Sequence, residues 1–147
     1  MSQSECFLCH KHQHLETYVG EVIAERDGLI VSHFPFLPDE KATKGHLIIE
    51  PRRHITDLSD LNDAETNALG GLARDATRAI KTQLKAEHVY LFRINDKVAH
   101  LHFHLVPRYA DTPREFWGLR IMEWPDREIV NLSQIQALAR RLKANFA

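Results

Sequence analysis

Three histidines alternate with apolar residues in the last third of the chain, and this pattern constrains the local structure more than any other. The segment from His100 to Val106 reads HLHFHLV, so that His102 and His104 follow His100 at every second position. Such alternation is typical of a β-strand, because successive side chains point to opposite faces. Side chains two positions apart lie roughly 6.6 Å from each other. The pattern therefore predicts a strand with one apolar face and one face of imidazoles that can surround a bound group.

Three segments together resemble the histidine triad (HIT) family of nucleotide hydrolases and transferases. The first is the triad with its extension to Tyr109, which resembles bacterial members similar to diadenosine polyphosphate hydrolases. The second is KGHLIIEPRRH at residues 44–54, which resembles the family's segment of lysine, glycine, histidine, apolar strand, proline, basic residue and histidine. The third is the CFLC string at residues 6–9, as in the members that carry zinc. The resemblance spans most of the chain up to Tyr109.

The triad, taken together with the resemblance, predicts covalent chemistry at phosphorus. A neutral imidazole is a good nucleophile near pH 7, because its ordinary pKa is about 6.5. The resemblance implies that His102 attacks the α-phosphorus of a dinucleoside polyphosphate or a nucleoside phosphoramidate and forms a nucleotidyl-histidine intermediate. His104 would bind the non-bridging oxygens, and His100 would be tied to zinc or to orienting the site. This scheme requires no catalytic metal.

Two other functions remain open from the sequence. Alternate histidines on a strand can also bind a metal ion and a water for hydrolysis, which would make the protein a metal-dependent hydrolase. A non-catalytic nucleotide-binding role is the second alternative. Chelators would abolish turnover in the first case, whereas nucleotide would bind without turnover in the second.

Candidate substrate-binding residues lie in two loops. Asn95 resembles the family's asparagine before the triad, but Lys97 stands about where many HIT proteins carry a serine or glutamine. Lys97 is therefore either a phosphate contact or an exposed loop lysine. Asp39 is the nearest match to the acidic residue that contacts the ribose in HIT proteins, with a spacing that differs by about one residue; it is equally compatible with a turn after Pro38.

The two cysteines, Cys6 and Cys9, have the spacing of a metal or redox motif. Two thiolates need two further zinc ligands, and either the nearby histidines or distant ones can supply them. The nearby candidates are His10, His12 and His14, and the distant ones are His54 and His100. In the zinc-bearing relatives the ligands are the cysteine pair, the histidine after the proline and basic residues, and the first triad histidine. The resemblance thus implies a structural zinc ion held by Cys6, Cys9, His54 and His100.

Size and charge restrict the partners. A chain of 147 residues with 44% hydrophobic and 27% charged residues can form one sizeable core, so we expect a single HIT-like domain over 1–147, with a core of about 6–109 and a C-terminal extension of 110–147. A net charge of -1 argues against nucleic acid as the main ligand. The chain has no long uncharged apolar run and its start lacks the features of a signal peptide, which predicts a cytoplasmic protein without a membrane partner. The resemblance also implies a homodimer.

Turn and capping signals predict an α+β fold. Asp27-Gly28 is a strong hairpin signal. Asn62 and Glu65 have the residue types of a capping box, which predicts a long helix to about Lys85, and Ser133 with Gln136 predicts a second box at a closing helix. We therefore expect a HIT-like fold in which about five antiparallel strands form a meander with the helices on one side. The strands are expected at residues 17–25, 29–33, 45–50, 88–94 and 100–106.

Overall fold

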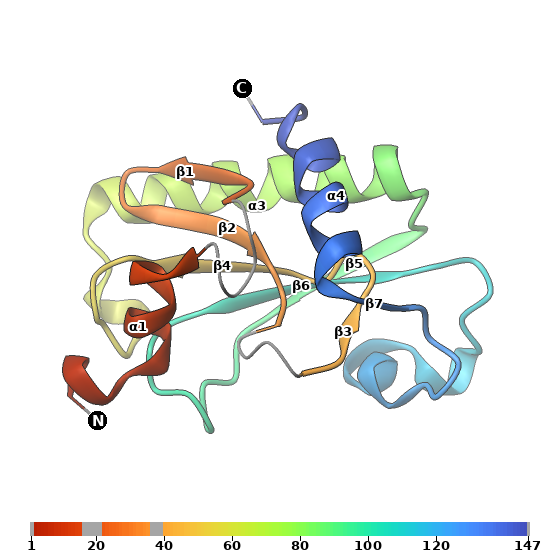
Figure 1. Ribbon diagram of the computed structural model, residues 1–147, viewed down its shortest axis with the longest axis horizontal. Coiled ribbons are helices and arrows are strands. Elements are labelled where there is room, and N and C mark those ends of the chain that lie inside the picture. Colours follow the sequence, from red (N-terminus) through yellow and green to blue (C-terminus); the bar gives the residue numbers. More distant parts are fainter. Residues whose placement is uncertain (1, 16–21, 36–39, 147) are drawn as a thin grey trace.

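A five-stranded antiparallel sheet forms the centre of the computed structural model, which describes residues 2–15, 22–35 and 40–146 (Figure 1). The strand order is β1-β2-β4-β6-β5, so β6 lies between β4 and β5. The predicted antiparallel α+β fold is confirmed, but the order differs from that of a simple meander because β4 pairs with β6. The strands are β1 (Ala24–Arg26), β2 (Leu29–His33), β4 (Leu47–Pro51), β5 (His88–Phe92) and β6 (Phe103–Arg108).

Shorter elements surround this sheet. A separate two-stranded sheet joins β3 (Ala42–Thr43) to β7 (Ile129–Val130). Within the described residues, 3-10 helices lie at Gln3–Glu5, Leu58–Asp60, Arg114–Phe116 and Gly118–Glu123. The α-helices in the same ranges are α1 (Phe7–Gln13), α3 (Asp63–Leu84) and α4 (Leu132–Lys143). No helix in the described ranges is both long and apolar enough to cross a membrane.

The long helix α3 begins and ends where its sequence signals predict. The side chain of Asn62 accepts a hydrogen bond from the Glu65 backbone at 2.9 Å, while the Glu65 carboxylate accepts one from the Asn62 backbone at 2.9 Å. Such reciprocal capping satisfies two amides that lack a partner in the first turn. Lys85 follows the last turn with φ of 60°, the left-handed conformation that ends many helices. One apolar side of α3 packs on the sheet and on α4, forming the main hydrophobic core.

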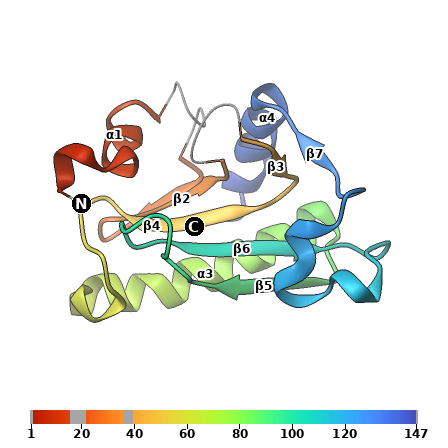
Figure 2. The same cartoon turned by 90° about the horizontal axis from the view of Figure 1, so that it is seen from below.

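The helix α1 lies on the face of the sheet opposite α3, as Figure 2 shows. Leu8 and Cys9 of α1 pack on Ile48 of β4, whereas Leu47 and Ile49 point into the main core below α3. Neighbouring residues of a strand face opposite sides, so the sheet is covered on both faces. The prediction of helices on one side was therefore wrong, because it treated the start of the chain only as a cysteine-bearing segment.

Several predicted boundaries differ from the structure. Of the strand predicted at 17–25, residues 22–25 are described, and the observed strand β1 covers Ala24–Arg26; residues 16–21 lie outside the described residues. The strands predicted at 45–50 and 88–94 are observed as β4 (Leu47–Pro51) and β5 (His88–Phe92). The triad strand begins at Phe103 and not at residue 100. The cap of α4 is formed by Asn131 and Gln134, not by Ser133 and Gln136. The helix thus begins two residues earlier than a cap at Ser133 predicts. Asn and Ser are equally good N-cap residues.

Candidate functional site

His102 lies just before β6 and is almost completely buried, with 4% of its surface exposed. Its Nδ1 atom is 2.8 Å from the carbonyl oxygen of His100. A carbonyl can only accept a hydrogen bond, so the Nδ1 atom donates and the lone pair of the neutral ring resides on Nε2. Burial lowers the pKa of His102, and this effect outweighs the hydrogen bond to His100 and the charge of Glu50. The ring is therefore neutral near pH 7, with its Nε2 lone pair available.

The segment His100–His102 is held by loops and not by the sheet. The Leu101 amide donates to the carbonyl of Ile55 at 2.8 Å. The side-chain amide of Asn95 donates to the carbonyls of Ala99 and His100, at 3.3 and 3.2 Å. These contacts replace the strand pairing predicted for residues 100–102, and they fix the backbone carbonyl that orients His102.

His104 forms the second half of the site together with a histidine that the sequence analysis did not select. The Nδ1 atom of His104 and the Nε2 atom of His46 lie 2.9 Å apart, and the His102 and His104 rings are 4.9 Å apart at 79°. Phe34 stacks on His46 at 4.5 Å, and Phe92 stacks on His104 at 5.0 Å. The position of His46 within the KGH string at residues 44–46 was the signal that could have identified it.

Burial keeps both rings of this pair neutral near pH 7. Desolvation lowers the pKa of His104 to about 4, with a further contribution from His102. Desolvation likewise lowers the pKa of His46 well below its ordinary value, and the neighbouring histidines add to the effect. In a neutral pair one nitrogen donates and the other accepts. The hydrogen bond between His46 and His104 therefore fixes the tautomers of both rings.

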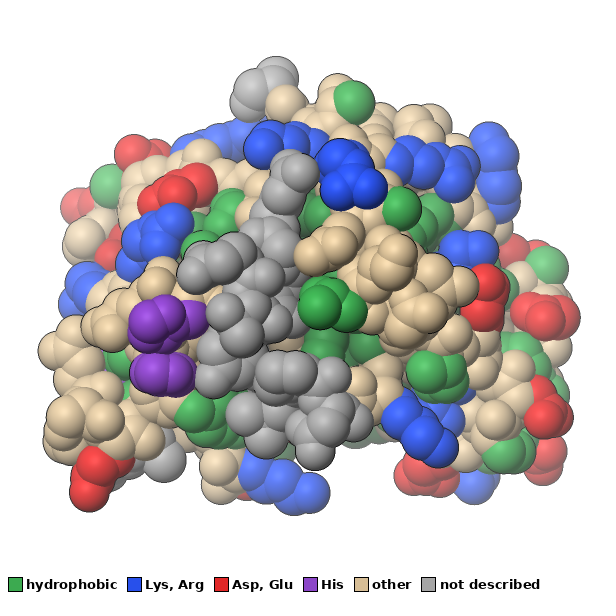
Figure 3. Space-filling view, in the orientation of Figure 1, with side chains coloured by type: hydrophobic (Ala, Val, Ile, Leu, Met, Phe, Trp, Pro, Cys, Tyr) green, Lys and Arg blue, Asp and Glu red, His purple; other side chains and the backbone are tan. Residues whose placement is uncertain are grey.

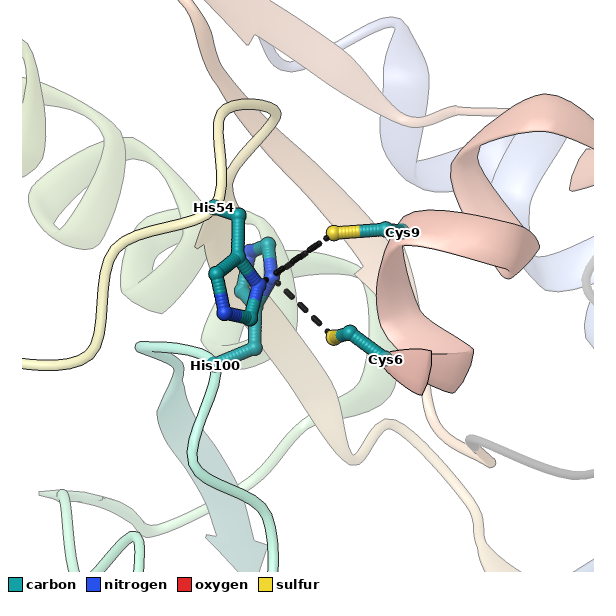
Figure 4. Close-up of side chains that lie close together, drawn as sticks. All are labelled: Cys6, Cys9, His54 and His100. Atoms are coloured by element: carbon teal, nitrogen blue, oxygen red, sulfur yellow. Dashed lines mark hydrogen bonds between the residues drawn. The ribbon is translucent and has the colours of Figure 1, made fainter. Parts of the chain in front are cut away.

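Four side chains converge next to the triad as a candidate metal site (Figure 4). Cys6 and Cys9 come from the start of α1, His54 from the loop after β4, and His100 from the segment before β6. The Nδ1 atom of His100 is 3.5 Å from each sulfur, and the Nδ1 atom of His54 is 3.4 Å from the Cys9 sulfur. All four ligand atoms lie within 4.8 Å of one another.

The chemistry of this group fits a tetrahedral metal ion. Zinc bonds of about 2.3 Å to sulfur and 2.0 Å to nitrogen place tetrahedral ligand atoms roughly 3.3 to 3.8 Å apart, which agrees with the distances of 3.4 and 3.5 Å from the histidine nitrogens to the sulfurs. The Nε2 atom of His100 donates to the carbonyl of Pro51 at 2.7 Å, so its Nδ1 lone pair points toward the thiols. A backbone carbonyl commonly fixes a metal-binding histidine in this way. Burial and the neighbouring Cys6 raise the pKa of Cys9 to about 11, so a bound ion would have to displace its proton.

The geometry separates the three triad histidines into two groups. His100 points to the cysteines, and the one cluster of at least three potential ligands found among the described residues includes neither His102 nor His104. A single metal ion held by all three triad rings is therefore not supported. Of the alternative zinc ligands, His10 and His14 are exposed and contact each other with ring centroids 4.6 Å apart. Figure 3 shows histidine side chains together on the surface over α1.

Of the three predicted substrate-binding residues, two lie in the loop before the triad and one lies outside the described residues. Asn95 supports the backbone before the triad, with φ of 63° and its Nδ2 atom turned to the loop carbonyls. Lys97 is exposed in the same loop. Asp39 lies outside the described residues, which leave out 36–39. The hydrogen bonds of Asn95 thus hold the loop before the triad in position.

An ion cluster that the sequence analysis missed lies between α1 and the sheet. Glu50 of β4 forms an ion pair with Lys11, and its Oε1 atom is 3.0 Å from the Nε2 atom of His12. Glu50 is 0% exposed and Lys11 is 1% exposed. The charged Glu50 within the otherwise apolar stretch of residues 47–50 was the signal that could have revealed this cluster, since an isolated carboxylate is rarely buried without a partner.

Two proteins of similar sequence are named as enzymes that act on nucleotides. The chain is 27% identical over 116 residues to adenosine 5'-monophosphoramidase hnt1 of Schizosaccharomyces pombe, covering 76% of this chain and 80% of that protein. It is 28% identical over 105 residues to the AP-4-A phosphorylase of Mycobacterium tuberculosis, covering 60% of this chain and half of that protein.

Solved structures share the fold across nearly the whole chain. A HIT-like protein from Bartonella henselae, described as involved in cell-cycle regulation, superposes with a TM-score of 0.70 at 18% identity and covers 99% of this chain and 98% of its own. A Zn-bound histidine triad family protein from Mycobacterium smegmatis gives a TM-score of 0.66 at 18% identity, covering 99% and 95%. The model of the HIT domain matches residues 31–111. The chain therefore belongs to the HIT domain family.

Proposed function

We propose that this chain is a HIT-type nucleotide hydrolase or nucleotidyl transferase that forms a covalent intermediate on His102. The observation that carries the proposal is the 2.8 Å hydrogen bond from the His102 Nδ1 atom to the His100 carbonyl, which leaves the lone pair on Nε2. The relatives named as a monophosphoramidase and as an AP-4-A phosphorylase support a nucleotide substrate. A nucleoside phosphoramidate and a dinucleoside polyphosphate are the two substrate classes consistent with them.

The reaction proceeds in two displacements. The Nε2 lone pair of His102 forms a bond to the α-phosphorus, while the bond from phosphorus to the leaving oxygen or nitrogen breaks and the leaving group takes up a proton from solvent. Water or another acceptor then attacks the same phosphorus and gives up its own proton to solvent, the bond between nitrogen and phosphorus breaks, and His102 returns to its neutral form. His104 donates a hydrogen bond to the phosphate oxygens, in a tautomer set by His46. Dividing one difficult displacement into two easier ones is the advantage of a covalent intermediate.

Mass spectrometry of the intact protein tests this proposal. The native chain is mixed with an adenosine phosphoramidate or diadenosine tetraphosphate, quenched rapidly without acid, and weighed. We expect an adenylyl adduct in the native chain and in the matched control His14→Ala, which removes an exposed histidine, and none in His102→Ala. Turnover that requires a metal and passes through no adduct would instead favour a metal-dependent hydrolase. Nucleotide binding with neither adduct nor turnover would indicate a binding protein.

The four-ligand group is proposed to hold a structural zinc ion through Cys6, Cys9, His54 and His100. Its support is the agreement of the ligand separations with tetrahedral zinc and the Zn-bound relative from Mycobacterium smegmatis. When bound, the ion supplies a fixed link between α1 and the loops that carry His54 and His100. Elemental analysis of the purified protein tests this proposal, with one zinc ion per chain as the expected result and no zinc as the contradicting one.

A homodimer is proposed for the active protein. Its support is the edge strand β5, where Leu91 is 54% exposed and Ile94 just beyond the strand is 54% exposed. A hollow lined by β5, Gly118 and Leu119 adjoins this edge. Light scattering at micromolar concentration tests the dimer. Twice the mass of one chain is expected, a further Leu91→Glu substitution should shift the mass toward that of one chain, and a native protein with only the mass of one chain would contradict it.

A further inference from the structure

Glu50 carries a buried negative charge beside the triad, and we propose that it is a positioning residue for the transfer step. In this role its carboxylate stabilises the positive charge that appears on His102 when the Nε2 atom bonds to phosphorus. The inference rests on the proposed covalent mechanism and adds a residue to it. Lys11 has the supporting role of holding the carboxylate in place.

The carboxylate of Glu50 is fully buried yet ionised. Burial alone would raise its pKa, but the Lys11 ammonium and His12 more than offset this and lower the pKa of Glu50 to about 2. One oxygen, Oε1, faces both Lys11 and His12. The other oxygen, Oε2, is buried without a hydrogen-bond partner among the residues that the structure describes. A buried oxygen left in this state costs free energy, so a purely structural ion pair does not account for it.

The sheet register places this charge next to the nucleophile. Ile48 of β4 pairs with His104 of β6, and Ile49 pairs with Phe103. The pairing ends there, and the next residues along the two chains are Glu50 on β4 and His102 just before β6. By alternation Glu50 lies on the face that carries Ile48 and His104, and the ring of His102 lies 4.9 Å from that of His104. His12 makes a second connection, because its Nε2 atom contacts Glu50 while its ring lies 5.4 Å from the ring of His100.

The field of the carboxylate reaches the triad face of the sheet at His104. The charge of Glu50 raises the pKa of His104, against the lowering effects of burial and of the neighbouring His102. Glu50 therefore acts on this face from the strand next to the triad.

The chemistry of the first displacement requires such a charge. Attack by a neutral imidazole that keeps its Nδ1 proton produces an imidazolium bonded to phosphorus, so one unit of positive charge develops at a buried position. Charges interact more strongly in a buried site than in water, and a carboxylate fixed in advance needs no reorganisation during the reaction. A role limited to docking α1 would need no charge, since an apolar pair of similar size can fill such an interface.

The variant Glu50→Gln tests the inference because it keeps the shape and removes the charge. We expect the single-turnover rate of adduct formation with an adenosine phosphoramidate to fall about 10- to 100-fold, while the affinity for AMP changes less than about threefold. Glu50→Gln leaves Lys11 buried without its partner, so the double variant Glu50→Gln with Lys11→Met is made in parallel. We expect the double variant to recover the melting temperature but not the rate.

A buried acid elsewhere in the molecule provides the matched control. Asp75 on α3 pairs with Arg26 and Arg74 on the opposite side of the sheet. The variant Asp75→Asn should lower the melting temperature yet leave the rate of adduct formation unchanged.

The outcomes separate the inference from the proposed function. A native adduct together with a native rate in the double variant would overturn the inference alone, and the ion pair would then serve only to dock α1. A slow rate in the double variant with a native rate in Asp75→Asn supports it. If the native chain forms no adduct with either substrate class, the covalent mechanism itself is wrong and the role of Glu50 fails with it.

Discussion

The Nε2 atom of His46, just before β4, and the Nδ1 atom of His104 on β6 lie 2.9 Å apart. The buried His46 and the half-buried His104 belong to an aromatic row, with Phe34 against His46 and Phe92 against His104. The row leaves the imidazole of His104 little freedom to rotate. His46 therefore orients the ring of His104, although it lies just before β4 and outside the triad.

Removing this hydrogen bond should slow the reaction more than it weakens binding. We expect His46→Leu to lower kcat about 10- to 100-fold, because leaving one buried polar partner unsatisfied costs about 1 to 3 kcal/mol. The variant His46→Gln can keep a nitrogen or oxygen at the Nε2 position and should lose less than about fivefold. Steady-state kinetics of both variants would check this. Equal losses in the two variants would show that His46 acts by packing and not by its hydrogen bond.

Metal removal should destabilise the chain through α1. The cysteines connect α1 to His54 and His100, so chelator treatment of the native protein should lower Tm by several degrees, at roughly 2 to 4 °C per kcal/mol for a chain of this size. The variant Cys9→Ser removes one ligand, and its Tm should start lower and no longer respond to chelator. Thermal melts with and without chelator would measure both effects. A native protein whose Tm does not respond to chelator would argue against a structural ion.

The sheet and the long helix could be predicted because their signals are local. Asn62 and Glu65 cap α3 within one turn, and the β2 strand agrees with the predicted residues 29–33. The triad pattern gave the correct face for His104 but the wrong start of the strand. Whether residues 100–102 join the sheet depends on Ile55 and Asn95, whose contacts with that segment alternation cannot reveal.

Contacts between distant segments account for what the sequence did not predict. The helix α1 was missed because seven residues are too few for a periodic pattern, and its place on the sheet depends on Ile48 and on the metal-ligand group. Lys11 and Glu50 are 39 positions apart and become partners only when α1 lies on β4. The charge of Glu50 on the otherwise apolar strand β4 indicated a buried partner, but the sequence did not identify Lys11 as that partner.

A buried histidine outside the triad should make the stability depend on pH. The Nδ1 atom of His33 donates to the Phe34 carbonyl, and its Nε2 atom accepts from the Gly45 amide at 3.0 Å. Desolvation lowers the pKa of His33 to about 4, against about 6.5 for an unfolded histidine. Since the unfolded chain binds this proton more readily, the stability contribution is complete above pH 6.5 and declines as the pH falls toward 4.

The variant His33→Gln should flatten this dependence. Between pH 7 and pH 5, the free energy of unfolding of the native chain should fall more steeply than that of His33→Gln, by up to about 1.4 kcal/mol per pH unit for one proton. Urea denaturation at several pH values measures the slopes. The variant Asn62→Ala, which removes the cap of α3, serves as the control because it should lower stability by about 1 kcal/mol at every pH and keep the native slope. Parallel slopes for the native chain and His33→Gln would contradict the prediction. A histidine whose pKa is lower in the folded chain than in the unfolded chain must reduce the free energy of unfolding as the pH falls.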